Sequence, residues 1–324
     1  MRTTKTIFDQ SVAKAVAKGF DAPVKTLPSW LFYDQTGDQL FQQIMRMPEY
    51  YPTRCEYDIL QKNKDDILRH FGAGGKPFHL IELGAGDGLK TEILLKHFLT
   101  HETDFTYFPV DISASALGQL SSRLKAEMPR LRLHPLNKTY DEALQNFRGH
   151  DQRKVILFMG ANIGNFSVAE ATQFLRKLAL PLAANDMILV GFDLKKDPRV
   201  IQEAYDDPRG LTRSFNLNIL TRLNRELGAH FDLQDFTHYP YYNPESGTTK
   251  SYLISMRDHS VYIEGLGRSI HFHLWEPVQT EISQKYDGRM IDKLVTLSGL
   301  AIEHVFYDSD KYFCDVLMKS ADVH

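Results

Sequence analysis

Between residues 54 and 191, short apolar runs alternate with segments that are apolar at the spacing of one helix face. The runs are long enough for buried parallel strands. Strands separated by helices indicate a parallel, doubly wound α/β sheet with right-handed crossovers. Ligands of such sheets bind over the carboxyl ends of the strands, so the segments that follow the strands are the first candidates for a site. The predicted strands are 78–83, 105–110, 131–136, 155–159 and 187–191, and the predicted helices are 54–71, 89–99, 114–126 and 168–183.

After about residue 197 the pattern changes. Two helical segments, 198–206 and 211–227, precede four stretches between 235 and 274 that alternate with period two, which predicts an antiparallel sheet. An apolar helix (286–299) and two strands (301–308 and 311–318) can return to the parallel sheet. We therefore expect two domains, residues 61–196 plus 286–324 and, as a second α+β lobe, residues 1–60 plus 197–285.

Composition narrows the classes of protein that fit. A chain of 324 residues with 43% hydrophobic content can bury a sizeable core. The net charge of −3, with no basic runs, argues against nucleic-acid binding. Cys55 and Cys314 stand alone, which suits a reducing compartment. There is no signal-like N-terminus and no run of about 18 apolar residues. We expect a soluble, cytoplasmic protein.

A glycine-rich turn follows the predicted strand 78–83. Gly84, Gly86 and Gly88 alternate there and lead into a helix, a layout that brings backbone N–H groups to a small ligand. Glu82 would repel a pyrophosphate but can accept hydrogen bonds from an ammonium group or a ribose hydroxyl. Asp111 ends the next strand and is placed to bind a ribose diol. The pattern resembles the first motif of class I S-adenosylmethionine-dependent methyltransferases; the alternative is a turn that serves only packing.

A second candidate stretch, Phe158-Met-Gly-Ala-Asn-Ile-Gly-Asn-Phe166, also follows a buried strand. Its glycines let the backbone approach a ligand closely. The amides of Asn162 and Asn165 can both donate and accept, which suits an amino acid carboxylate or amine. The alternative is a strand-to-helix turn with asparagine as the N-cap.

Two further features carry weaker signals. Six aromatic residues fall within 22 residues near the N-terminus; such density more often fills a core, although tyrosine hydroxyls can also cap a pocket. They are Trp30, Phe32, Tyr33, Phe41, Tyr50 and Tyr51. His271 and His273 share one face of a predicted strand and could begin a zinc site. Only Glu276 lies close in sequence and no recognisable spacing completes a ligand set, so we expect no metal.

Several blocks of the sequence resemble one family in order. FYDQTGDQLFQQIMRMPEYYPTR, ELGAGDGLKT, FMGANIGNF, GFDLKKDP, AYDDPRGLTRSFNLNIL, NRELGAHFDL and TEISQKY are similar to the histidine-specific N-alpha-methyltransferases of ergothioneine biosynthesis. The resemblance runs from about Leu27 to the C-terminus. It implies a class I, Rossmann-like methyltransferase domain with S-adenosylmethionine as cofactor.

The resemblance also implies roles for individual residues. Tyr33 would orient the α-amine. Two positions differ from the family pattern. Ser251 stands where family members often carry methionine, and Thr139-Tyr140 stands where an acid–aromatic pair is expected near the adenine, with the neighbouring Asp141 as a substitute acid. The implied substrate-binding residues are Tyr33, Phe41, Tyr50, Gly160, Asn165, Tyr205, Ser251, Glu281 and Ser283, with Tyr205 joining Asn165 at the carboxylate. The cofactor-binding residues are Glu82, Gly84, Gly86, Lys90, Asp111 and Tyr140.

Glu281 and Ser283 also make physical sense as imidazole ligands. Residues at i and i+2 of an extended segment share one face. A carboxylate beside a hydroxyl can engage both ring nitrogens, and a wrong substrate would leave buried polar groups unpaired, which can discriminate by roughly 10⁴-fold. The alternative is an exposed strand end with solvated polar residues.

The implied reaction is attack of the deprotonated α-amine of L-histidine on the cofactor's methyl group, repeated three times to give N-alpha-trimethylhistidine (hercynine). We expect a monomer that acts on a small amino acid, without nucleic-acid or membrane partners. Two rivals stay open: the same fold acting on another amino acid or amine, and a nonenzymatic ligand-binding protein.

Overall fold

The computed structural model describes residues 8–72, 75–147 and 152–321. The chain divides into two compact units. Unit 1 is formed within Met1–Tyr50 and Asp197–Ser283, and unit 2 within Tyr51–Lys196 and Gln284–His324. The first division falls at Tyr51 instead of the expected residue 61, because α3 (Tyr51–Phe71) is one continuous helix whose buried side chains pack in unit 2.

Unit 2 contains a seven-stranded sheet in the order β11-β12-β5-β4-β1-β2-β3. The pairs from β5 to β3 are parallel, whereas β12 runs antiparallel to both β5 and β11. The order reverses between β1 and β4, so this is the switch point at which doubly wound sheets bind ligands. The strands are β1 (Phe78–Leu83), β2 (Phe105–Asp111), β3 (Leu136–Asn137), β4 (Arg153–Phe158), β5 (Met187–Asp193), β11 (Leu300–Tyr307) and β12 (Phe313–Ser320).

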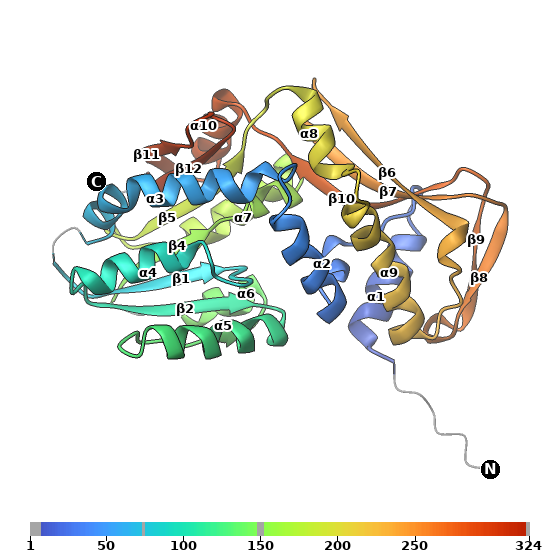
Figure 1. The fold of residues 1–324 in the computed structure, drawn as a ribbon, viewed down its shortest axis with the longest axis horizontal. Coiled ribbons are helices and arrows are strands. Elements are labelled where there is room, and N and C mark those ends of the chain that lie inside the picture. Colours follow the sequence, from blue (N-terminus) through green and yellow to red (C-terminus); the bar gives the residue numbers. More distant parts are fainter. Residues whose placement is uncertain (1–7, 73–74, 148–151, 322–324) are drawn as a thin grey trace, which may run out of the picture. The chain divides into compact units, whose positions relative to one another are not determined.

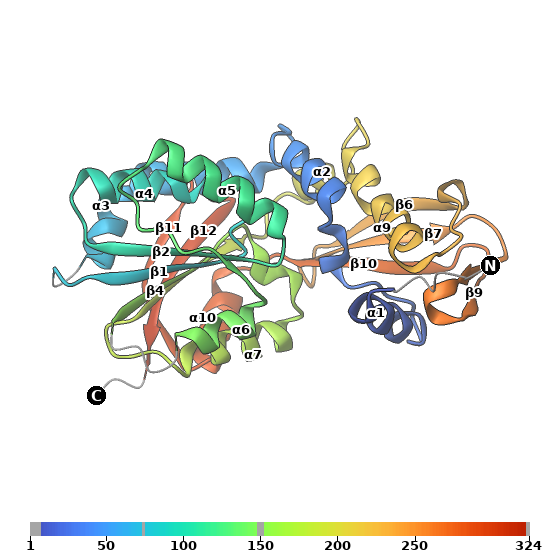
Figure 2. The ribbon, with the colours of Figure 1, turned by 90° about the horizontal axis from the view of Figure 1, so that it is seen from below.

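Helices cover both faces of this sheet. Figure 2 shows α3, α4 and α5 on one face and α6, α7 and α10 on the other. The helices besides α3 are α4 (Thr91–Thr100), α5 (Ala114–Glu127), α6 (Tyr140–Asn146), α7 (Val168–Ala179) and α10 (Gly288–Leu297), with a short 3₁₀ helix, η2 (Asn162–Asn165). The apolar residues of β1, β4 and β5 form a buried core with α7 and α10. The predicted doubly wound α/β fold is confirmed.

Two elements of unit 2 differ from the prediction. The strand expected over 131–136 is only Leu136–Asn137, preceded by a single bridge between Leu133 and Tyr107. Pro135 lies between them and has no N–H to donate to a ladder. Helix α6 was not predicted, although its signal was present, because Thr139 and Glu142 form a capping box.

Unit 1 combines helices with two small sheets (Figure 1). The expected single antiparallel sheet is wrong: β6 and β7 pair antiparallel but β10 takes the other edge of β7, so β8 and β9 form a separate two-stranded ribbon. The strands are β6 (Phe236–Asn243), β7 (Thr248–Ser255), β8 (His259–Ile263), β9 (Arg268–Phe272) and β10 (Pro277–Gln284). The helices are α1 (Gln10–Phe20), η1 (Ser29–Phe32), α2 (Gln35–Met45), α8 (Pro198–Tyr205), α9 (Leu211–Leu227), η3 (Leu233–Asp235) and η4 (Glu264–Leu266).

Unit 1 has its own buried core. The apolar face of α9, including Ile219, Leu223 and Leu227, packs with α1 residues such as Val16 and with Phe272 of β9. Within the described ranges, no helix is both long enough and apolar enough to cross a membrane.

Candidate active site

The loop after β1 reaches the switch point of the sheet in unit 2. Gly84, Gly86 and Gly88 all adopt positive φ, at 77°, 53° and 64°. A side chain is strained in that region, which explains the alternating glycines. A Cβ added to Gly86 would meet no atom within 4 Å, so there is open space beside the backbone where a ligand can approach.

Asp111, at the end of β2, holds this loop. Its carboxylate accepts a hydrogen bond from the backbone N–H of Gly86 at 2.9 Å and from that of Ser113 at 2.8 Å. Burial raises the pKa of Asp111, against the opposing effect of these N–H donors. A carboxylate offers about four lone-pair sites, so these two bonds leave acceptor capacity for a diol.

The structure places Glu82 beneath the loop. It is 4% exposed, and its carboxylate accepts hydrogen bonds from the hydroxyl groups of Thr91, at 2.5 Å, and Tyr107. Burial raises the pKa of Glu82 to about 7. Both oxygens therefore anchor β1 to β2 and to the start of α4, and direct contact of Glu82 with a ligand stays a prediction.

Glu56 is a central residue of this region that the sequence prediction missed. It is fully buried on α3 and forms an ion pair with Lys90. It also accepts the backbone N–H of Gly160, at 2.8 and 3.0 Å from its two oxygens. One carboxylate thus ties the loop after β1 to the loop after β4. The sequence did contain a signal for Glu56, because it is an acid on the apolar face of the predicted helix 54–71. A charge that is buried in this way is rarely unpaired, so a partner could have been expected.

Lys90 and Asp315 complete the buried charge cluster around Glu56. Burial alone would lower the pKa of Lys90, but Glu56, followed by Asp315 and Glu82, raises it. Burial and the neighbouring Glu56 together raise the pKa of Asp315 well above its ordinary value. The pair of acids and the lysine therefore form one interacting group below the two loops.

The loop after β4 brings Gly160 and Asn162 to the same place. Gly160 and Ala161 both have positive φ, 75° and 58°, and the Asn162 amide donates to the Met159 carbonyl at 2.8 Å. A Cβ on Gly160 would come within 3.3 Å of the Lys90 Nζ, and one on Gly84 within 3.2 Å of the Asn162 amide nitrogen. The two glycine loops therefore converge.

Asn165 ends the same loop, in η2, and is half-buried. Within the part of the chain that the structure describes, its side chain makes no hydrogen bond, unlike Asn162. Asn162 is thus used to shape the loop, whereas Asn165 keeps its amide for other contacts.

Tyr140, the first residue of α6, is the predicted aromatic neighbour of the cofactor. Its ring packs against Phe158 and Phe174, with centroids 5.4 and 5.7 Å apart, and a Cβ on Gly84 would lie 2.9 Å from its hydroxyl oxygen. Asp141, the suggested substitute acid, forms a surface ion pair with Lys177 at 2.9 Å. The structure therefore brings Tyr140 to the glycine loop and gives Asp141 a different partner.

In unit 1, the predicted aromatic residues meet in one cluster. The Phe41 ring lies 5.8 Å from Tyr33 and 6.0 Å from Tyr50, both edge to face. Phe215 of α9 joins them, at 5.7 Å from Phe41 and 5.9 Å from Tyr33. Sequence reasoning missed Phe215, which lies far from the others along the chain.

The predicted polar residues of unit 1 form two hydrogen-bonded pairs along β10. Ser251 of β7 donates to the Glu281 carboxylate at 2.9 Å, and the Tyr205 hydroxyl donates to Ser283 at 2.8 Å. Glu281 and Ser283 are at i and i+2 of β10, so they share a face. Ser251 is fully buried and therefore acts as a support for the Glu281 carboxylate.

A family model described as "Histidine-specific methyltransferase, SAM-dependent" matches residues 12–320. The chain belongs to this family. A "Histidine N-alpha-methyltransferase" from Mycolicibacterium smegmatis is 34% identical over 92% of each chain. "Ergothioneine biosynthesis protein 1" from Schizosaccharomyces pombe is 33% identical over 70% of this chain and 30% of its own, longer chain. An "L-tryptophan methyltransferase trpM" from Psilocybe serbica is 28% identical over 90% of this chain and 87% of its own.

The protein is thus an S-adenosylmethionine-dependent methyltransferase, and the predicted resemblance and cofactor are confirmed. The histidine-specific methyltransferase fold provides a set of residues in unit 2 that fits this cofactor. Open space beside Gly86 can admit a nucleoside, and the Asp111 carboxylate has acceptor capacity for its ribose. The positive φ of Gly84 and Gly160 lets two loops approach the same ligand.

Proposed function

We propose that this protein methylates the α-amino group of L-histidine three times, giving the trimethylated betaine. The observation that carries the proposal is the match of nearly the whole chain to a histidine-specific family, together with its similarity to a histidine N-alpha-methyltransferase and to an ergothioneine biosynthesis protein. The ordered pair Glu281 and Ser283 on β10 supports histidine as the amino acid.

Unit 2 is proposed to hold the cofactor. S-adenosylmethionine supplies a methyl group on a positively charged sulfur. Asp111 accepts the ribose hydroxyls while it keeps the Gly86 N–H, and Tyr140 packs beside the adenine. The positive charge of Lys90 is paired with the negative charge of Glu56 below the two loops.

The amino acid backbone is assigned to the loop after β4. The Gly160 backbone is fixed by Glu56, and Asn165 offers an amide that can donate to a carboxylate. These two contacts would set the position of the α-carbon and hence of the amine. Position is decisive, since a shift of about 1 Å can cost roughly 10²-fold in rate.

The imidazole ring is assigned to β10. Ser251 fixes the orientation of the Glu281 carboxylate, and Tyr205 does the same for the Ser283 hydroxyl. A carboxylate accepts the ring N–H, and the hydroxyl can then donate to the other, unprotonated ring nitrogen. An amino acid without ring nitrogens would leave both groups unpaired, which is the physical basis of selectivity.

The aromatic cluster of unit 1 suits successive methylation. Each methyl group removes an N–H donor from the amine, so hydrogen bonds alone cannot hold the later intermediates. Aromatic faces attract methylated ammonium groups without needing N–H donors. Tyr33, Phe41 and Tyr50 supply such faces, and Tyr33 adds a hydroxyl that can orient the first amine.

A second candidate function is methylation of another amino acid. A relative at 28% identity is named an L-tryptophan methyltransferase, and Ser251 takes the position at which we expect methionine from the family pattern. A serine in that wall changes both the volume and the polarity of the pocket.

We also propose a monomeric, cytoplasmic enzyme; light scattering on the purified chain tests the oligomeric state.

The test is mass spectrometry of the products formed from a panel of amino acids with S-adenosylmethionine. We expect histidine to give a +3-methyl product faster than tryptophan or phenylalanine gives any product. Glu281→Ala should reduce kcat/KM for histidine by about 10- to 10³-fold, the scale of one charge-assisted hydrogen bond plus misplacement of the amine. The ratio of histidine to phenylalanine turnover should then approach one.

Glu276→Ala is the matched control, because it removes an acid next to the start of β10 whose carboxylate pairs with Lys25. It should leave the turnover ratio unchanged. If Glu281→Ala lowers activity equally for all substrates and lowers the melting temperature, Glu281 is a packing residue. If tryptophan is the preferred substrate of the wild type, the assignment to histidine is wrong.

A further inference from the structure

Strands β8 and β9 form a two-stranded ribbon in unit 1 (Figure 1). The face opposite its buried side chains carries a group of exposed polar residues. Ser260 pairs directly with His271 across the ribbon, so their side chains share a face. The neighbouring residues Val261 and Phe272 point to the buried side. His273 follows β9 and Asp258 precedes β8, which extends the same outward row by one pair.

Two imidazole nitrogens and the two oxygens of one carboxylate lie close together in this row. His271 Nε2 and His273 Nδ1 are 3.2 Å apart. The Asp258 carboxylate lies 3.3 Å from His271 Nε2 through one oxygen and 3.2 Å from His273 Nδ1 through the other. Ligands about 2.0–2.1 Å from a tetrahedral metal are about 3.3 Å from one another, and each of these contacts has that length. With one Asp258 oxygen chosen as the ligand, the three ligand atoms all lie within 4.8 Å of one another, so a small turn of the carboxylate would place them around one ion.

We propose that Asp258, His271 and His273 bind a divalent transition-metal ion such as Zn²⁺, leaving at least one position for water. Two imidazoles and a carboxylate are typical ligands of zinc, cobalt, nickel and copper, whereas calcium and magnesium prefer oxygen alone. The site is separate from the residues assigned to methyl transfer. A bound ion would connect Asp258, just before β8, to the two histidines at the end of β9.

The surroundings orient the two histidine ligands. His271 Nδ1 lies 3.1 Å from the Ser260 hydroxyl, so a proton on Nδ1 can be donated there while Nε2 keeps its lone pair. The backbone N–H of His273 donates to Glu276 at 2.9 Å, and Glu276 is in turn paired with Lys25. Partners of this kind fix tautomers and ring orientation in metal sites. Glu276, the acid close in sequence, therefore supports the site, and Asp258 provides the carboxylate.

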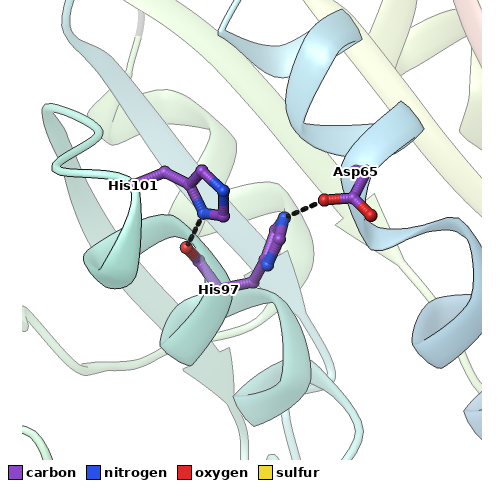
Figure 3. A group of neighbouring side chains, drawn as sticks. All are labelled: Asp65, His97 and His101. Atoms are coloured by element: carbon purple, nitrogen blue, oxygen red, sulfur yellow. Dashed lines mark hydrogen bonds and ion pairs between the residues drawn. The ribbon is translucent and has the colours of Figure 1, made fainter.

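A second His–His–Asp group provides an internal comparison. Figure 3 shows Asp65 of α3 with His97 of α4 and His101, which caps the C-terminal end of α4. His97 Nε2 is 3.0 Å from Asp65, but the His101 imidazole is bonded through Nδ1 to the His97 backbone carbonyl at 2.9 Å. The ligand atoms of both groups lie within 4.8 Å of one another, but here only His97 and Asp65 are at hydrogen-bond distance, whereas all three residue pairs of the ribbon are within 3.3 Å, which is why we assign the metal to the ribbon.

The test is titration of the purified, metal-stripped full chain with Zn²⁺ against a chromophoric chelator of known affinity. We expect one zinc ion per chain. His271→Ala or His273→Ala should weaken binding by about 100-fold or more, and Ser260→Ala by about 10-fold, the range seen for residues that orient metal ligands. His97→Ala and His101→Ala are matched controls and should keep wild-type affinity.

The ribbon ligands are exposed, so melting curves without metal should be the same for all ribbon variants and the wild type. Loss of binding in His97→Ala or His101→Ala, with retention in His271→Ala, would move the site to the other cluster and overturn the proposal. So would the absence of stoichiometric binding to the wild type. Equal histidine methylation with and without zinc is expected, because the site is separate from the reaction.

Discussion

The two units position their candidate residues by different physical means. In unit 2 the residues are on loops at the ends of parallel strands, held by positive-φ glycines and by buried charges such as Glu56 and Lys90. In unit 1 they are side chains of helices and strands, held by aromatic packing and by hydroxyl hydrogen bonds such as Tyr205 to Ser283.

This difference indicates different sensitivities to mutation. A buried ion pair that loses one partner leaves an uncompensated charge, which costs far more than the loss of a neutral hydrogen bond. Changes in the unit 2 cluster should therefore affect stability and cofactor binding together. Single changes in unit 1 should mainly alter the recognition of the amino acid.

The largest effect is expected for Glu56→Ala. It leaves Lys90 buried without its ion-pair partner and removes the acceptor of the Gly160 N–H, so the free energy of unfolding should fall by roughly 3–5 kcal/mol. Affinity for S-adenosylmethionine should fall as well. Chemical denaturation and titration calorimetry provide the measurements.

Asp34→Ala is the matched control for Glu56→Ala in unit 1. Like Glu56, Asp34 is a carboxylate with several partners, since it pairs with Arg225 and accepts hydrogen bonds from the Asn218 amide and from the Gly37 N–H. It should reduce stability but leave cofactor affinity unchanged. If Glu56→Ala leaves stability and cofactor binding unchanged, Glu56 does not have the proposed role of connecting the two loops.

The next effect concerns pH and Glu82. Its folded-state pKa of about 7 lies above the ordinary value of 4.5, because the carboxyl is buried. Between these values the folded state keeps a proton that the unfolded state has lost, so stability should fall as pH rises through this window and level off above it. Relative to Glu82→Gln, the wild type should lose up to about 3 kcal/mol across the window.

The measurement for Glu82 is the difference in free energy of unfolding between wild type and Glu82→Gln from pH 4 to 8, approximately the range of both pKa values. Glutamine has nearly the same shape, and its amide oxygen can accept from one of the Thr91 and Tyr107 hydroxyls while its NH2 donates to the other, so packing is preserved. If the difference in free energy of unfolding does not change with pH, the Glu82 carboxyl has the same pKa in the folded protein as in the unfolded chain, which contradicts the prediction.

The smallest effect is expected for Tyr205→Phe in unit 1. It removes one neutral hydrogen bond, from the Tyr205 hydroxyl to Ser283, so stability should fall by about 1 kcal/mol. The KM for histidine should rise while affinity for S-adenosylmethionine stays the same. Tyr262→Phe, on the exposed side of the β8–β9 ribbon, is the control. Equal losses in affinity for both ligands would contradict the separation of roles between the units.

Much of unit 2 could be predicted from the sequence because its signals are local. Apolar runs that alternate with helical segments predicted most of the strands and helices, and alternating glycines marked the turn at Gly84 and Gly86 directly after β1. A backbone turn of positive φ has to be encoded at its own position, so it is visible without knowledge of the fold. The family blocks then pointed to individual residues of both units, and their ligand-binding roles stay predictions.

Other features were decided only by tertiary structure. Glu56 comes 34 residues before Lys90 and 104 before Gly160, yet one carboxylate joins them. Ser251 and Glu281 are 30 residues apart, and Phe215 joins aromatic residues from the N-terminal segment. The third ligand of the ribbon cluster, Asp258, is 15 residues from His273.

The chain by itself therefore determined most elements of unit 2, the doubly wound sheet, the glycine loop after β1 and the family. Tertiary structure decided which distant side chains share a buried charge, an aromatic cluster or a strand face. The physical reason is that backbone conformation and amphipathic spacing depend on neighbours in sequence, whereas ion pairs and ring contacts such as Glu56 with Lys90 form between residues that only strand order and register bring together.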